Sequence, residues 1–208
     1  MQPASLSGDI PSYGLTGQFG RASYRRGMTG DQRINATKGE KMRDVFSEIS
    51  LTTVEKFKFA RYVIISPNPE DDVMGYMERW AKNSGLLHYP GYTPRMIGWD
   101  FPFVSEEQKE QYGLRGYVAA YIIPEEFEPA CGGAELGYQE TDHYAKITVT
   151  DPFSNPFEKI TGAYGKIYEF AKERHIIARS YKDRICMEEV FIKDGVTYMD
   201  VYVPVDNG

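Results

Sequence analysis

Two stretches of the chain alternate apolar residues with polar or basic ones, and each stretch leads into a helical pattern. They are residues 59–64 (FARYVI) and 144–149 (YAKITV). Alternation with period two predicts β-strands. An Asn-Pro pair follows each, Asn68-Pro69 and Asn155-Pro156. Because Asn caps free helical amides and Pro fits the first turn, we expect a helix to begin at both pairs.

Apolar side chains then recur at helical spacing on one stripe of each predicted helix. The first stripe comprises Val73, Tyr76, Met77, Trp80 and Ala81, and the second comprises Phe157, Ile160, Tyr164, Ile167, Tyr168 and Ala171. We expect both stripes to pack against a sheet. Gly85 is expected to end the first helix.

A hairpin follows each helix, so the whole pattern is a repeat. The hairpin strands are residues 95–101 and 116–122 in the first copy, and 184–190 and 197–203 in the second. The separation between matched residues is 85 at the first strand, 87 at the helix, then 89 and 81 along the hairpin. Loops tolerate insertions that elements do not, so this drift predicts a duplicated β-α-β-β unit.

The predicted fold is therefore α+β, with two pseudo-symmetric halves at about 54–124 and 140–206. Residues 132–135 (GGAE) act as the linker, and the stretch between the hairpin strands of the first half is a short helix or a lid. In this alignment Trp99 matches Glu188, and Asp100 matches Glu189.

Residues 1–50 differ from the rest in composition, with seven glycines in the first 40 residues. Such a segment buries too little apolar surface to offset its ordering entropy, so we expect a flexible N-terminal arm before a domain at 51–208. A natural tail, vector-derived or upstream sequence before a start at Met42, and a partner-binding arm all fit. Whether residues 1–41 are native stays open.

Charge and reactive residues exclude several classes of function. The formal net charge of −6 argues against a direct nucleic-acid partner. Cys131 and Cys186 form no CxxC pair, and no apolar run is long enough to span a membrane, which favours a cytoplasmic protein with free thiols. The three histidines lack metal-ligand spacing, so no metal and no cofactor are expected.

Alternation along the hairpin strands assigns side chains to two faces of the sheet. The helix side is predicted to carry Val118, Ala120, Ile122, Met199, Val201 and Val203. The opposite face is predicted to be open, aromatic and acidic, with Tyr117, Tyr121, Tyr198, Asp200 and Tyr202.

The duplicated unit, residues 189–194 (EVFIKD) and the closing 200–205 (DVYVPV) resemble the GyrI-like small-molecule-binding family. This family includes gyrase-inhibitory proteins and the effector-binding domains of AraC-type and MerR-type regulators. The resemblance covers residues 54–206. It implies two SHS2 modules and a ligand groove at their pseudo-twofold junction, with a central glutamate among aromatic rings. Glu189 matches that glutamate best; Glu188 would face the other way, and which of them lines the groove stays open.

Aromatic rings attract flat ligands and cations, and a half-buried carboxylate adds selectivity for positive charge. We therefore expect the open face to bind hydrophobic aromatic molecules, cationic or neutral, as a sensor or a sequestering protein. The predicted ligand-binding residues are Trp99, Phe101, Tyr117, Tyr121, Tyr144, Glu189, Tyr198 and Tyr202. Core packing for Trp99, and a lysine-paired surface carboxylate for Glu189, are the alternatives.

Some GyrI-like proteins hydrolyse cyclopropane-bearing alkylating compounds, so a hydrolase on the same groove is the alternative function. Its catalytic residues would be Glu189 as general base, with Asp100 and Tyr121. Modulation of gyrase by protein contact is a third possibility. The sequence leaves open the natural ligand, turnover and the oligomeric state.

Overall fold

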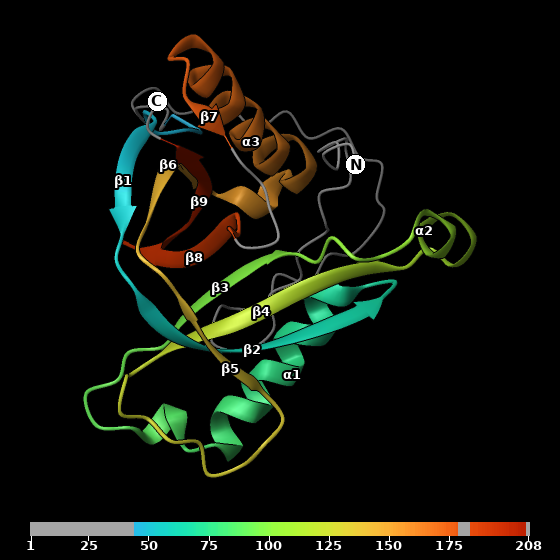
Figure 1. The fold of residues 1–208 in the computed structure, drawn as a ribbon, viewed down its shortest axis with the longest axis vertical. Helices are drawn as coiled ribbons and strands as arrows, with labels where there is room; N and C mark the ends of the chain where they lie inside the picture. The colour runs from blue at the N-terminus through green and yellow to red at the C-terminus, as the bar shows by residue number, and fades with distance from the viewer. Residues whose placement is uncertain (1–43, 179–183, 207–208) are drawn as a thin grey trace, which may run out of the picture.

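The structure is a computed structural model that describes residues 44–178 and 184–206 (Figure 1). Most of the predicted N-terminal arm, residues 1–43, lies outside the described residues. Its last residues pair with the domain: the Ser47 amide donates to the Thr148 carbonyl at 2.9 Å, and the Thr150 amide to the Val45 carbonyl at 2.8 Å.

The two predicted β-α-β-β units are both present. The first consists of β2 (Phe57–Ser66), α1 (Pro69–Asn83), β3 (Arg95–Asp100) and β4 (Arg115–Ile123). The second consists of β6 (Asp142–Thr150), α3 (Pro156–Glu173), β8 (Met187–Lys193) and β9 (Val196–Asp206). The predicted α+β class is confirmed.

Further elements surround these units. They are β1 (Ser50–Val54), the 3-10 turn η1 (Leu86–His88), α2 (Glu106–Tyr112), β5 (Glu135–Gln139), the turn η2 (Pro152–Ser154) and β7 (Ile177–Ala178). The short helix between β3 and β4 is thus present as α2. The linker prediction for residues 132–135 is wrong at its end, because Glu135 begins β5 and pairs with Arg61.

One antiparallel sheet joins the two halves in the order β1-β6-β9-β8-β3-β4-β2-β5, with β7 paired to β9. The halves meet where β3 pairs with β8. Each outer strand crosses over: β1 leads directly into β2 but pairs with β6, whereas β5 leads directly into β6 but pairs with β2. Figure 1 shows the sheet curving between α3 and α1, which lie at opposite ends of the molecule.

The curvature encloses the face without helices, here called the inner face. Tyr144 of β6 and Phe59 of β2 belong to one buried cluster there, although four strands separate β6 from β2 in the sheet. The opposite surface, the helix face, carries a separate core under each helix. Val73 and Met77 anchor the core under α1, and Ile160 and Ile167 anchor the core under α3.

Both helices begin at the predicted Asn-Pro pairs, but not through the predicted caps. Neither asparagine side chain caps a backbone amide. The side-chain nitrogen Nδ2 of Asn155 donates instead to Glu158 Oε2 at 2.5 Å. The first turn of α1 is held by Arg115, whose guanidinium donates to both oxygens of the buried Glu70 at 2.9 and 3.2 Å. Gly85, with a φ of 84°, follows α1 as predicted.

Candidate functional site

Strand pairing corrects the alignment of the two halves. In the predicted repeat Val63 of β2 matches Thr148 of β6. Val63 pairs with Val118 in β4, and Thr148 pairs with Asp200 in β9. Val118 therefore matches Asp200, one residue away from the match that the sequence alignment gives.

The same displacement affects the next strands. Val118 pairs with Trp99 in β3, and Asp200 pairs with Glu189 in β8. Trp99 therefore matches Glu189, and the predicted match of Trp99 with Glu188 is wrong. A displacement of one residue exchanges the two faces of a strand, because side chains alternate with period two.

The faces predicted for β4 are accordingly reversed. Tyr117 and Tyr121 lie in the core under α1, on the helix face. Val118, Ala120 and Ile122 belong to the inner-face cluster instead. The prediction for β9 is confirmed: its three apolar residues Met199, Val201 and Val203 lie in the core under α3.

Most of the predicted ligand-binding residues lie on the inner face and pack against one another. Trp99 is 7% exposed and contacts Phe59 edge-on, with ring centroids 6.3 Å apart. Tyr144 is fully buried and meets Tyr202 edge-on. Phe101 packs on this cluster, while Tyr198 stacks on Phe191. Trp99, Phe101, Tyr144 and Tyr202 thus share one inner-face cluster with Phe59.

Glu189 also lies on the inner face, paired with a base. The Arg95 guanidinium donates to both of its oxygens, at 2.7 and 2.9 Å. These bonds raise the pKa of Arg95 further above its ordinary value, although burial opposes them. Across the β8–β9 pairing, Asp200 accepts from Lys146 Nζ at 2.9 Å, from Thr148 Oγ1 at 2.5 Å and from Tyr202 Oη at 3.3 Å.

Glu188 occupies the seam between the halves on the helix face. Its carboxylate accepts the Tyr117 hydroxyl at 3.0 Å and the Tyr164 hydroxyl at 2.9 Å. Tyr117 comes from β4 of the first half and Tyr164 from α3 of the second. Glu188 is 7% exposed and Tyr117 is 3% exposed. We call these three residues, with Gly98 and Asp100 beside them, the Glu188 cluster.

The cluster sits at the point about which the halves are related. Gly98 of β3 pairs directly with Glu188, and in the corrected alignment each is the match of the other. The pseudo-twofold axis therefore passes between these two residues. One half contributes a carboxylate at the axis, and the other contributes a position without a side chain.

Burial and nearby acidic groups act on the Tyr164 hydroxyl of the cluster. Burial raises the pKa of Tyr164 well above its ordinary value, and the charges of Glu188 and Asp100 raise it further. The hydroxyl thus stays protonated and serves as a donor. Two carboxylates lie within electrostatic range of this one phenol.

Of the predicted residues, the structure brings Tyr117 and Asp100 into the Glu188 cluster. Tyr121 lies on the same face in the core under α1, where burial raises its pKa. Glu188 was the alternative to Glu189. Tyr164 and Gly98 were missed. Tyr164 belongs to the apolar stripe of α3, and no sequence signal separates it from the packing residues around it.

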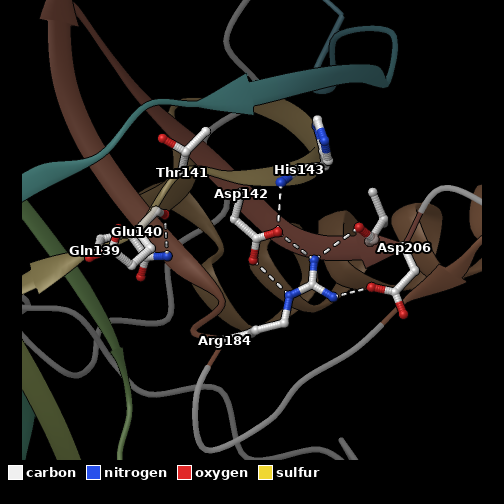
Figure 2. A pocket seen from close by; sticks show the side chains of 8 residues that line it. Gln139, Glu140, Thr141, Asp142, His143, Arg184 and Asp206 are labelled. Atoms are coloured by element: carbon white, nitrogen blue, oxygen red, sulfur yellow. Dashed lines mark hydrogen bonds and ion pairs between the residues drawn. The ribbon is translucent and has the colours of Figure 1, made fainter.

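A second feature is an open cavity of about 780 Å³ where the β5–β6 turn meets the end of β9 (Figure 2). None of its lining residues was predicted as a site residue. Figure 2 shows Arg184 between two carboxylates. Its guanidinium donates to both Asp142 oxygens at 2.7 Å and also to Asp206. The arginine therefore ties the start of β6 to the end of β9, and we interpret it as a structural clamp.

Over residues 44–178 and 184–206, no group of His, Cys, Asp and Glu side chains has the arrangement of a metal site. No helix in this part of the chain is long and apolar enough to cross a membrane.

No family model and no curated protein matches the chain. Several solved structures are similar to it in fold. The C-terminal domain of EcmrR is 9% identical with a TM-score of 0.56, over 77% of this chain and 98% of that domain. EcmrR in a complex with DNA gives the same TM-score, and there this chain spans only 59% of the EcmrR chain. A hydrolase from Listeria innocua is 10% identical with a TM-score of 0.50, over 76% and 92% of the two chains. The chain therefore shares the fold of the EcmrR C-terminal domain.

Proposed function

We propose that the protein binds a small aromatic molecule with a positively charged group, and that the Glu188 cluster holds that group. The observation that carries this proposal is the placement of Glu188: a buried carboxylate at the pseudo-twofold axis, accepting one phenol hydroxyl from each half. The site differs from the open aromatic face that the sequence suggests, but the chemistry is the one expected there.

The charges of the cluster favour a cation. Glu188 and Asp100 both act on the Tyr164 hydroxyl. Glu188 is buried and Asp100 is exposed, and two like charges beside one another favour a neighbouring positive charge. Phenol rings add attraction to a cation through their electron-rich faces, by up to ~2 kcal/mol when water is excluded. A flat cation with a hydrogen-bond donor suits both features.

The comparisons support the class of function. This chain corresponds to the C-terminal domain of EcmrR, and the solved EcmrR complex contains DNA. We infer that this chain corresponds to a ligand-binding part rather than to a DNA-contacting part, because its net charge of −6 disfavours phosphate contacts. It would then act as a sensor or as a sequestering protein.

Two adjacent glutamates provide a matched test, because Glu188 and Glu189 lie on opposite faces of one strand. We expect ethidium, a planar fluorescent cation, to bind the wild-type protein. Glu188→Gln should weaken binding at least ~10-fold, the loss expected when one charged partner disappears. Glu189→Gln should change it less than about twofold, because Arg95 already pairs with Glu189 on the inner face. Fluorescence titration measures both, and the reverse order would move the site to the inner face.

Hydrolysis of an electrophilic ligand is the second candidate, favoured by the same carboxylate. Glu188 would activate a water molecule, and Tyr117 or Tyr164 would donate a proton to the leaving atom. One neighbour in fold is named a hydrolase. A cyclopropane-bearing alkylator incubated with protein should then give ring-opened product faster than in buffer, and Glu188→Gln should abolish the difference. Product at the buffer rate would exclude turnover and leave binding untouched.

A further inference from the structure

We infer that Gly98 is a positioning residue: the absence of a side chain there lets Tyr117 reach Glu188. This inference refines the proposed function, since it concerns how the Glu188 cluster is held. Gly98 lies in β3, between β4 and β8, and pairs with Ala119 on one side and Glu188 on the other. Tyr117 is two residues from Ala119 along β4, on the same face.

The space above Gly98 is occupied by the phenol of Tyr117. A Cβ atom at residue 98 would lie 2.3 Å from Tyr117 Oη, 2.6 Å from Cε1 and 2.7 Å from Cζ. Real Cβ atoms do not approach other heavy atoms so closely. The ring therefore crosses directly over the glycine on its way to the carboxylate, and any side chain at this position displaces it.

Backbone conformation does not account for this glycine. Gly98 is absent from the glycines with positive φ in the described part of the chain, so an ordinary residue would fit its dihedral angles. A glycine within a strand weakens it, and often marks a place where another group approaches closely. Here the close group is the hydroxyphenyl end of Tyr117, and its hydroxyl is one of the two phenols on Glu188.

Little freedom is available for Tyr117 to avoid a new side chain. Its side chain is 3% exposed and packs in the core under α1. Moving the ring aside takes the hydroxyl away from Glu188 and leaves Tyr164 as the phenol donor of the cluster. Gly98 thus allows a second phenol hydroxyl, that of Tyr117, to reach the Glu188 carboxylate beside that of Tyr164.

A double-mutant cycle tests this inference. Gly98→Ala, Tyr117→Ala and the double variant are compared with the wild-type protein by urea unfolding and by ethidium titration. Gly98→Ala should lower the urea midpoint in the wild-type background but should not lower it in the Tyr117→Ala background, because the clashing ring is then gone and alanine suits a strand better than glycine. Ethidium affinity should follow the same pattern, with a ~5- to 10-fold loss from Gly98→Ala only where Tyr117 is present. Gly165→Ala, at a helical glycine with open space around it, is the matched control and should not lower the midpoint.

A pH profile separates positioning from simple packing. A hydrogen bond to a carboxylate stabilises its charged form. When that bond is lost, the carboxylate is protonated at a higher pH, so cation binding fails at a higher pH as the solution is acidified. Gly98→Ala and Tyr117→Phe should shift the midpoint of ethidium binding in this same direction. Equal effects of Gly98→Ala in both Tyr117 backgrounds would overturn the inference. If the wild-type protein bound no ethidium, the proposed cation site would fail, while the unfolding cycle would still decide the role of Gly98.

Discussion

The two halves share one backbone plan but use matched positions for opposite chemistry. At the axis, the first half has Gly98 where the second has Glu188. On the inner face, Trp99 packs into an apolar cluster, whereas its match Glu189 pairs with Arg95. The scaffold is symmetric, but at these two matched pairs of positions the carboxylate belongs to the second half.

This division explains how the sheet can place acidic residues beside its core. Asp200, the match of the buried Val118, is 7% exposed but accepts three hydrogen bonds from side chains of β6 and β9. Buried polar groups are tolerated when they are paired in this way. The matching position in the first half is Val118, which packs in the apolar inner-face cluster and needs no such network.

The largest effect on stability is expected at Trp99, the matched position that the first half uses for packing. Trp99→Ala should lower the free energy of unfolding by ~3–5 kcal/mol, as for other buried aromatic residues cut to alanine. Urea unfolding measures this loss. Trp99→Phe, which keeps most of the apolar surface, should leave ethidium affinity unchanged; a large loss of affinity there would restore the inner face as the ligand site.

An intermediate effect is expected at the polar network of the second half. Asp200→Ala should lower the free energy of unfolding by about 2 kcal/mol, because hydrogen bonds to a charged group are lost and Thr148 is left without its acceptor. Asp200→Asn keeps the shape and should cost less. Thermal or urea unfolding of both variants tests this order, and equal losses would show that the charge of the carboxylate, rather than its shape, accounts for the whole effect.

The smallest effect is expected at Glu189, the match of Trp99. Glu189→Ala removes an ion pair whose arginine side chain is 56% exposed, and such pairs contribute ~0–1 kcal/mol. Added salt should reduce even this difference, because it screens the exposed charge. A loss as large as that of Trp99→Ala would mean that the matched positions are energetically alike and would contradict the comparison.

The sequence predicted the fold well because each half carries strong local patterns. The strands at residues 59–64 and 144–149, the Asn-Pro helix starts and the stop at Gly85 all follow from short-range chemistry. The match of the first strands is correct, and the strand register of the structure is consistent with it. Outer strands β1 and β5 were harder, because they join the distant half.

The faces of β4 could not be predicted from its sequence. Residues 116–121 are all buried, since α1 covers one side and the curled sheet encloses the other. A strand buried on both sides has no polar alternation to indicate its orientation. The sequence alignment, displaced by one residue, therefore met no contradiction, and it placed Tyr117 and Glu188 incorrectly relative to each other.

The crossed outer strands make each half incomplete without the other. β1 is continuous with the first half but belongs to the sheet of the second, and β5 does the reverse. A chain cut in the loop before β5 would give two fragments, each carrying an edge that its counterpart requires. We expect such fragments to reassemble when mixed, each donating its outer strand, β1 or β5, to the other. Two identical one-unit chains would exchange strands in the same way in a homodimer.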